Sequence, residues 1–398
     1  MARELNAASI PKGWSYGLLD DYAERCSGHT PSKSHPEYWN GGIKWISLAD
    51  TCRLDDGLVE ETDKEISDLG IQNSSAQLHP AGTVVLSRDA GIGKSGVMAE
   101  PMAVSQHFIA WKCDANKKLH NWYLYNWLQL HKPEFERQAV GSTIKTIGLP
   151  YFKKLKIAAP SYEEQRKIAK ILSTWDKAIS TTEKLIETSK QQKKALMQQL
   201  LTGKKRLINP ETGKVFEGEW KFAIFAELYK VANNKATQVK SSDYLDFGDT
   251  PVVDQGKSLI SGYTNNTNIY KDLPVIIFGD HTRIIKWVDF SFAQGADGTQ
   301  VLKNSKLLDA KFSYYVLANT TIPNLGYSRH MRELKEKDFK YPQNVAEQQR
   351  IASVLTTADK EIEILEAKLS YFKQEKKALM QQLLTGKRRV KVEEMEVA

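Results

Sequence analysis

The fourteen residues 193–206, KKALMQQLLTGKKR, return almost unchanged as residues 376–389, KKALMQQLLTGKRR. Thirteen of the fourteen positions are identical, and only Lys205 and Arg388 differ. An ungapped series of identities indicates an internal duplication, whereas two unrelated helices of similar composition would share residue types without sharing their order. The same offset, which takes position 193 to position 376, continues upstream in the pairs Ile168/Ile351, Ala169/Ala352, Leu172/Leu355, Asp176/Asp359, Lys177/Lys360 and Ile179/Ile362.

Both copies carry the start and stop signals of one long helix. A polar N-cap residue is followed three positions later by glutamate, which is a capping-box pattern. A glycine stands where a C′ glycine ends a helix, and no proline interrupts the segment between. About 40 residues lie between these signals, so each helix is expected to be about 60 Å long. The start pairs are Ser161 with Glu164 and Asn344 with Glu347, and the end glycines are Gly203 and Gly386.

Apolar residues recur along both helices with the 3.5-residue spacing of a coiled-coil seam. Two nearly identical helices in one chain most simply pack on each other, antiparallel if the chain is pseudo-symmetric. The alternative is that each helix is buried separately in a different domain. The predicted seam consists of Ile168, Leu172, Trp175, Ile179, Ile186, Leu196, Leu200, Ile351, Leu355, Ile362, Leu365, Leu369, Phe372, Leu379 and Leu383.

The segments outside the helices are mixed, with short β-like runs such as 83–86 and 274–278 separated by turn signals. We therefore predict an α+β protein, in which two globular α/β domains are separated by two long antiparallel coiled-coil helices with pseudo-two-fold symmetry. The two domains share little obvious sequence. The predicted boundaries are 1–160 for the first domain, 161–206 for the central helix, 207–343 for the second domain, 344–389 for the C-terminal helix and 390–398 for a tail.

The 398 residues have an ordinary globular composition, and their number predicts two or three domains. No run of 18 apolar residues predicts a membrane span, and the N-terminus lacks the apolar core of a signal peptide, so we expect a cytoplasmic protein. Cys26, Cys52 and Cys113 are isolated, which argues against a disulfide framework or a cysteine-based zinc site. The net charge of +8 favours a polyanionic partner.

That charge is unevenly distributed. The segment 161–206 has a net charge of +6, whereas 1–160 has 0 and 207–343 and 344–398 have +1 each. If the two domains bind DNA, they are therefore expected to do so through local basic patches.

Three catalytic motifs are suggested and then fail. The glycine-rich stretch 91–96 is followed by Pro101, which would disrupt the helix that a dinucleotide site requires, so a hairpin or loop is the better interpretation. The nearest approach to an adenine-methyltransferase motif, residues 149–152, lacks its first polar residue and second proline. Asp280, His281 and Asp297 fit no metal-nuclease spacing and are interpreted as turn residues. The chain is thus expected to be a binding protein and not an enzyme.

The layout and several stretches resemble the specificity subunit of type I restriction-modification systems. In the helices, the resemblance rests on Pro160 with residues 164–169, on residues 347–352, and on the Leu-Leu-Thr-Gly-Lys ends at 200–204 and 383–387. In the domains, it rests on 82–88, 91–93, 104–106, 276–283 and 295–298. The resemblance covers essentially the whole chain.

This resemblance implies two target-recognition domains, each recognising half of an asymmetric, interrupted double-stranded DNA sequence through the major groove. It implies partners as well: two modification subunits that methylate adenine, and restriction subunits that translocate and cleave. S-adenosylmethionine, ATP and Mg would then bind to those subunits and no cofactor to this chain, whose helices act as a spacer. A related system that combines cutting and methylation in one polypeptide, or a stand-alone DNA-binding or coiled-coil scaffold protein, remains an alternative.

Base recognition requires cationic, amide or hydroxyl side chains that reach the edges of the groove. Clusters beside glycine-containing loops are the preferred candidates, in particular Arg283 with Lys286, and Arg329 and His330 with Arg332. The first-domain candidates are Arg88, Lys94, Ser142, Thr143 and Lys145. The second-domain candidates are Lys257, Tyr263, Asn265, Asn266, Arg283, Lys286, Arg329, His330 and Arg332.

Overall fold

The computed structural model describes residues 10–141, 145–326 and 328–392. The chain forms two compact units, each of which contains one globular domain and parts of both long helices. Unit 1 comprises residues 1–182 and 368–398, and unit 2 comprises residues 183–367. Among the described residues, no helix is long and apolar enough to cross a membrane.

Unit 1 is built on a five-stranded sheet with the strand order β2-β9-β6-β7-β4. A three-stranded sheet, β5-β3-β8, and a two-stranded sheet, β1-β10, complete the domain. The strands are β1 Ser15–Leu18, β2 Glu24–Ser27, β3 Trp39–Ile46, β4 Leu58–Val59, β5 Lys64–Ile66, β6 Val84–Ser87, β7 Ser95–Met98, β8 Ala103–Val104, β9 Phe108–Lys112 and β10 Lys156–Ala159. The helices of this domain are α1 Asp68–Gln72, α2 Asn121–Gln138 and α3 Leu149–Lys153.

Unit 2 has a four-stranded sheet in the order β12-β19-β16-β17, a second sheet in the order β13-β18-β14-β15, and a strand pair, β11-β20. The strands are β11 Trp220–Ile224, β12 Tyr229–Val231, β13 Gln238–Val239, β14 Thr250–Val253, β15 Gly262–Thr264, β16 Val275–Gly279, β17 Ile285–Val288, β18 Ala293–Gly295, β19 Thr299–Asn304 and β20 Asp338–Pro342. The helices are α5 Phe225–Leu228, α6 Ala310–Ala318 and α7 Met331–Lys335.

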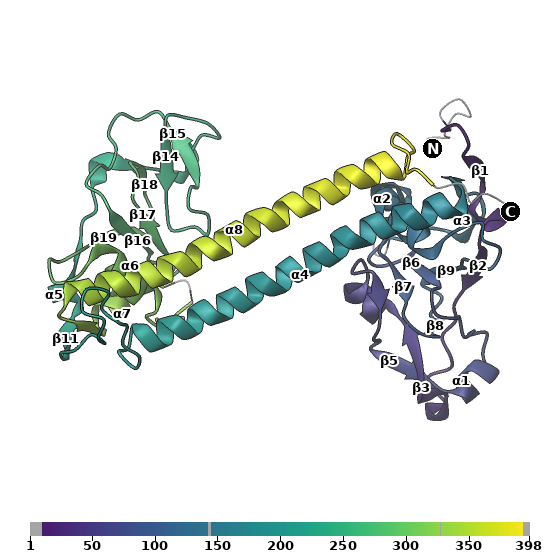
Figure 1. The fold of residues 1–398 in the computed structure, drawn as a ribbon, viewed down its shortest axis with the longest axis horizontal. Coiled ribbons are helices and arrows are strands. Elements are labelled where there is room, and N and C mark those ends of the chain that lie inside the picture. Colours follow the sequence, from purple (N-terminus) through teal and green to yellow (C-terminus); the bar gives the residue numbers. More distant parts are fainter. Residues whose placement is uncertain (1–9, 142–144, 327, 393–398) are drawn as a thin grey trace. The chain divides into compact units, whose positions relative to one another are not determined.

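The two domains share a strand topology that their sequences do not reveal. In both, four antiparallel strands run in one order, β2-β9-β6-β7 and β12-β19-β16-β17. In both, the second sheet contains a parallel pair next to an antiparallel pair, β8-β3-β5 and β18-β14-β15. A helix packs on each main sheet, α2 in unit 1 and α6 in unit 2 (Figure 1).

The central strands β6 and β16 explain why these sheets form. Every residue of β6 (VVLS) and of β16 (VIIFG) is buried, as expected for a strand covered on both faces. Both β-like runs predicted from the sequence are therefore confirmed as strands. The glycine-rich stretch 91–96 forms the turn between β6 and β7 and enters β7, with Gly91 and Gly93 at φ of 77° and 78°. This agrees with the predicted hairpin and leaves no helix for a dinucleotide site.

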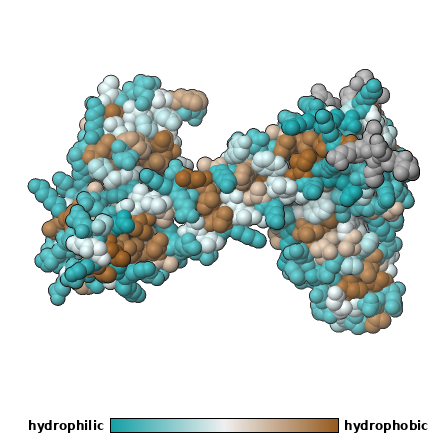
Figure 2. Space-filling model, viewed as in Figure 1, coloured by the Kyte–Doolittle hydropathy of each residue, from teal (hydrophilic) through white to brown (hydrophobic). Residues whose placement is uncertain are grey.

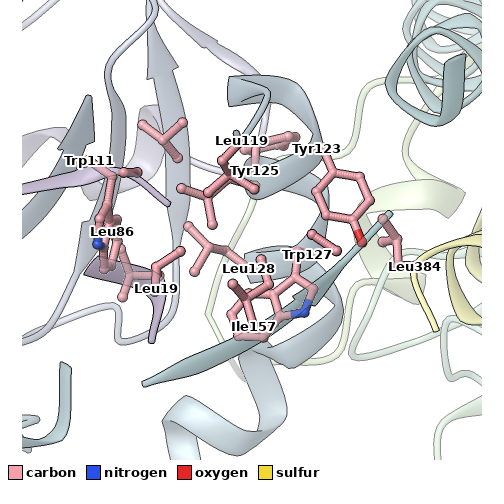
Figure 3. Close-up of a cluster of buried hydrophobic side chains, with 14 of the residues drawn as sticks. Leu19, Leu86, Trp111, Leu119, Tyr123, Tyr125, Trp127, Leu128, Ile157 and Leu384 are labelled. Carbon is pink, nitrogen blue, oxygen red and sulfur yellow. The ribbon is translucent and has the colours of Figure 1, made fainter. Parts of the chain in front are cut away.

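The core of unit 1 joins the sheet to the helices (Figure 3). Trp111 and Leu86 come from the sheet, Tyr123 from α2 and Leu384 from the segment that follows the C-terminal helix. Ile168, in the first turns of the central helix, is also fully buried there. Because burying one such side chain contributes about 1.5–3 kcal/mol, the helix ends are integral to the folding of this domain.

Two helices of 39 residues, α4 (Tyr162–Leu200) and α8 (Val345–Leu383), lie within the predicted helical segments. Gly203 and Gly386 have φ of 73° and 69°, the left-handed conformation of a C′ glycine. The N-cap half of the capping-box prediction holds, because the backbone NH of Glu164 donates to Ser161 Oγ over 3.4 Å.

The glutamates at the helix starts have a different role from the predicted one. Instead of returning to the N-cap, the Glu164 carboxylate accepts hydrogen bonds from Arg389 at 2.8 and 2.7 Å. In unit 2, the Glu347 carboxylate accepts from Arg206 at 2.5 and 2.6 Å. The two pairs are related by the offset of the duplication, and both glutamates are buried. In each unit, therefore, the start of one helix is tied to the segment that follows the other helix.

The next residue in each helix shows the same correspondence. Gln165 accepts a hydrogen bond from His120 N and donates to two backbone carbonyls, those of Lys118 and Pro160. Gln348 accepts from Asp309 N and donates to the carbonyls of Leu307 and Pro342. These fully buried amides fasten the start of each helix to its own domain.

Within each unit, α4 and α8 contact each other with opposite chain directions. In unit 1, Asp176 pairs with Lys376, and Trp175 meets Phe372 edge-on with ring centroids 5.6 Å apart. In unit 2, the corresponding Asp359 pairs with Lys193. Because Glu164 in the same unit as Asp176 pairs with Arg389, increasing residue numbers on one helix face decreasing numbers on the other.

None of the fifteen predicted seam residues is exposed. The outermost ones, however, belong to the domain cores: Ile168, Leu172 and Leu383 to unit 1, and Leu200, Ile351 and Leu355 to unit 2. Leu185 and Ile364 lie on the helices but remain 49% and 66% exposed. On the molecular surface, hydrophobic patches are separated by hydrophilic side chains (Figure 2).

Candidate nucleic-acid interface

Both domains bring loops together at the end of their central strand, and they do so through the same two backbone hydrogen bonds. In unit 1, Arg88 N donates to His107 O at 3.0 Å, and Arg88 O accepts from Ile147 N at 2.9 Å. In unit 2, Asp280 N donates to Gly298 O at 2.7 Å, and Asp280 O accepts from His330 N at 2.8 Å. This shared junction joins the turn after β6 or β16 to the segment that follows the domain helix.

A buried carboxylate reinforces the junction in unit 1. Asp89 Oδ2 lies 2.5 Å from His107 Nδ1, and Asp89 Oδ1 accepts from Thr146 Oγ1. Burial disfavours the charged form of Asp89, but the hydrogen bonds from Thr146 and His107 and the charge of Arg88 outweigh it and lower the pKa of this carboxyl. Asp89 is therefore an ionised acceptor that holds two segments distant from it in the sequence.

The turn beside this junction borders a cavity of about 530 Å³. Two of its three lysines are engaged, because Lys94 donates to Thr51 O at 3.0 Å and Lys132 pairs with Asp55 at 2.6 Å. The lining contains three lysines and one carboxylate, that of Glu136, which makes the cavity cationic. Its lining consists of Ala90, Gly91, Ile92, Lys94, Lys132, Glu136 and Lys145.

The unit 2 junction is closed by Asp280, whose carboxylate is also buried. Its Oδ1 accepts from Met331 N at 2.7 Å, at the first residue of α7. His330 is fully buried between the two segments, since its Nδ1 lies 2.9 Å from Asp280 O and its Nε2 accepts from Leu325 N at 3.2 Å. His330 thus shapes the loop, and we remove it from the candidate DNA contacts because its side chain cannot reach a groove edge.

Lys286 is likewise too buried to contact DNA, so the prediction that it does so is wrong. Only 6% of it is exposed, and its ammonium donates to the carbonyls of Asp254 at 2.7 Å and Ser258 at 2.5 Å. Desolvation lowers its pKa, and the nearby Asp254 carboxylate partly opposes that shift. Lys286 therefore stabilises the 254–261 loop through two hydrogen bonds to its backbone. Lys257, on the same loop, is exposed.

Glycines allow the same loop to lie against its neighbours. A Cβ on Gly298 would come within 2.6 Å of Gln255 and His281, and one on Gly295 within 2.4 Å of Asp254 Cβ. The backbone of this loop is also bound to the turn after β16, because Thr282 Oγ1 donates to Gln255 O at 2.6 Å. The segments 254–261, 279–283 and 295–298 therefore form one surface.

The remaining second-domain candidates differ in their exposure and in the partners that their side chains already have. Arg283 adopts a positive φ of 62°, and its guanidinium donates to Ile322 O at 3.1 Å. Arg332 is exposed but pairs with Glu336 at 3.0 Å. Arg329 and Asn266 are exposed, and Tyr263 is half-buried on β15. Asn265 is exposed, although its Oδ1 accepts from Asp249 N at 3.1 Å.

In unit 1, the candidates divide in a similar way. Arg88 is about one-fifth exposed at its side chain and lies 3.5 Å from Asp89, and Lys94 is half-buried at the cavity. Lys145 is exposed at the cavity rim. Ser142 and Thr143 lie outside the described residues. The organising role of Asp89, His107 and Thr146 could not be predicted from the sequence, since no local motif links three residues so far apart.

Within the described ranges, no group of three or more His, Cys, Asp or Glu side chains is arranged to hold a metal ion. Asp280 and His281 occupy the turn after β16, as interpreted from the sequence. Asp280 has a structural role, because its carboxylate accepts from Met331 N and its backbone NH donates to Gly298 O.

Comparisons with known proteins identify the family. The model of the type I restriction modification DNA specificity domain matches twice, over residues 11–191 and 217–372. The two matches cover most of the chain, and each includes most of one long helix, α4 in the first and α8 in the second. The chain therefore belongs to the type I restriction-modification DNA specificity family.

Relatives and solved structures agree with this assignment. The MjaVIII specificity subunit of Methanocaldococcus jannaschii is 26% identical, over 98% of this chain and 96% of its own length. The MjaIX specificity subunit of the same organism is 29% identical over 46% of this chain and 42% of its own length. An M. genitalium S subunit has the same fold, with a TM-score of 0.61, 15% identity and coverage of 96% of this chain and 97% of that one. Specificity subunits are the non-catalytic components of these systems.

Proposed function

We propose that this chain is the DNA-specificity subunit of a type I restriction-modification complex, and that it recognises an asymmetric bipartite target with one half-site per domain. The observation that carries the proposal is the occurrence of two domains with one strand topology and different loops in a single chain. A shared framework provides the same mode of docking twice. Different loop residues provide two different base preferences.

The long helices are proposed to be the spacer, an antiparallel coiled coil with pseudo-two-fold symmetry. The contacts that recur in both copies of the duplication support this arrangement, in particular Glu164–Arg389 with Glu347–Arg206 and Asp176–Lys376 with Asp359–Lys193. A helix advances about 1.5 Å per residue and duplex DNA about 3.4 Å per base pair. Helix length would therefore set the gap between half-sites.

We further propose that two modification subunits and the restriction subunits assemble on this chain in the cytoplasm. S-adenosylmethionine, ATP and Mg would bind to those partners. Membership of the specificity family supports this assignment. The near-neutral charge of the two domains is also consistent with partners that supply part of the grip on DNA phosphates, since such contacts depend on cationic side chains.

The test is to express the chain with its cognate methyltransferase subunits and to map methylated adenines across the host genome. The proposal predicts methylation at a two-part motif with a fixed gap, which disappears when the gene for this chain is omitted. Co-purification should recover two methyltransferase subunits per chain. DNA binding without any methylation or co-purifying methyltransferase would contradict the proposal and favour the stand-alone scaffold.

A further inference from the structure

The junction at the end of the central strand has a feature in both units that the proposed function does not assign. A buried aspartate, Asp89 or Asp280, stands at the equivalent strand end and accepts hydrogen bonds from a distant loop. Both residues are almost enclosed, with Asp89 7% and Asp280 2% exposed. Carboxylates are anionic hydrogen-bond acceptors, which DNA phosphates repel, so a direct contact with the backbone of DNA is unfavourable.

In unit 2, the carboxylate of Asp280 sets the position of α7. The N-cap residue of that short helix, His330, makes no capping hydrogen bond with its side chain, and Asp280 Oδ1 instead accepts from Met331 N. Arg329 precedes the junction by one residue and Arg332 follows Met331, and both are exposed. Asp280 thus fixes the backbone between two cations that could face DNA.

In unit 1, Asp89 performs the corresponding task with side-chain partners. It binds Thr146, whose neighbour Lys145 is exposed, and His107, which belongs to the turn before β9. Arg88, the residue before Asp89, makes the two backbone hydrogen bonds of the junction. The two units therefore reach one arrangement with different sequences, a buried carboxylate hydrogen-bonded to a segment that carries at least one exposed cation.

We infer that Asp89 and Asp280 are positioning residues, each of which sets the base specificity of its own domain by holding the cationic loop beside it. This inference rests on the proposed function. A group that acts only on stability would weaken binding to correct and incorrect sequences alike. A positioning residue would change the discrimination between them, because recognition of base edges depends on placement of the donor within a few tenths of an ångström.

The experiment uses the full chain in complex with its methyltransferase subunits and the duplex target found by methylation mapping. Each duplex carries a single base substitution in one half-site, and binding is measured at one salt concentration. Asp280→Ala should lower the discrimination at one half-site by about tenfold or more and leave the other half-site unchanged. Asp89→Ala should have the opposite pattern.

Three variants and one physical measurement serve as controls. Asp280→Asn keeps an oxygen that can accept from Met331 N, so it should restore discrimination. Asp246→Ala in unit 2 and Asp56→Ala in unit 1 remove exposed carboxylates that make no side-chain hydrogen bond in the described structure, and both should keep wild-type discrimination. Thermal unfolding of every variant separates lost fold from lost specificity.

The outcomes distinguish the inference from the function on which it rests. If the wild-type complex prefers a bipartite target but both alanine variants keep its discrimination, or lose it equally at both half-sites, the positioning role is overturned. If the wild-type complex shows no sequence preference, the proposed function itself fails. Loss of discrimination at one half-site per variant, with rescue by Asp280→Asn, supports the positioning role.

Discussion

The helices and the domains of this chain have diverged to very different extents. In the helices, individual contacts recur in both copies of the duplication, down to the buried Glu–Arg pairs and the amides of Gln165 and Gln348. In the domains, the strand order recurs, but the side chains at corresponding places differ, as His107 and Gly298 illustrate at the junction. The difference suggests that the helices must keep one geometry, while the domains need only a common framework with variable loops.

The buried Glu–Arg pairs give the largest expected effect. Glu347→Gln would leave the Arg206 guanidinium without its charged partner at a site where the glutamate is fully buried, and should lower the free energy of unfolding by about 3–5 kcal/mol. Chemical denaturation of the purified chain measures it. Glu164→Gln should cost less, because the Arg389 side chain that it leaves unpaired is 45% exposed, against 20% for Arg206.

An exposed pair of the same helices is the matched control. Glu366→Gln breaks the ion pair with Lys190, in which both side chains are about half exposed, and should cost less than about 1 kcal/mol. Equal costs for Glu347→Gln and Glu366→Gln would show that the buried pair has no special role.

In the domains, the corresponding prediction concerns specificity. Arg329→Ala should weaken binding to the specific target by about 1–3 kcal/mol if this arginine contacts a guanine, and Arg88→Ala should act on the other half-site. A titration of specific and nonspecific duplexes at fixed salt measures both effects. Arg283→Ala tests whether a guanidinium that already donates to Ile322 O also contacts DNA. An unchanged specific affinity would remove the residue concerned from the interface.

The smallest expected effect tests where the helix repeat ceases to be symmetrical. Both end glycines have a positive φ, so the backbone strain of alanine alone should cost about 1 kcal/mol at either position. At Gly386, a Cβ would also come within 2.3 Å of Pro11, whereas at Gly203 the nearest atom is a Trp220 ring carbon at 3.1 Å. Gly386→Ala should therefore be the more destabilising variant in thermal unfolding, and equal losses would contradict this difference.

The sequence predicted those parts of the fold that depend on local patterns. The helices followed from their repeat, caps and end glycines, and β6 and β16 from their apolar runs. The shared strand order could not be predicted, because it depends on pairing between distant segments with little common sequence. For the site, side-chain type and position beside glycine-containing loops suggested Lys286 and His330, but tertiary packing buries both of them. The role of Asp89 could not be predicted, because its partners, His107 and Thr146, are near it only in the folded chain.

The most direct test of the account is to shorten the proposed spacer. In the α4–α8 pairs Asp176–Lys376 and Lys193–Asp359, the two residue numbers add to 552. By the same relation, the heptad 180–186 of α4 corresponds to the heptad 366–372 of α8. Deleting both removes about 10 Å of helix, or about three base pairs. Methylation mapping should then show the two half-sites unchanged and the gap shortened by about three base pairs, or methylation lost. Continued methylation at the original motif with the original gap would contradict the account.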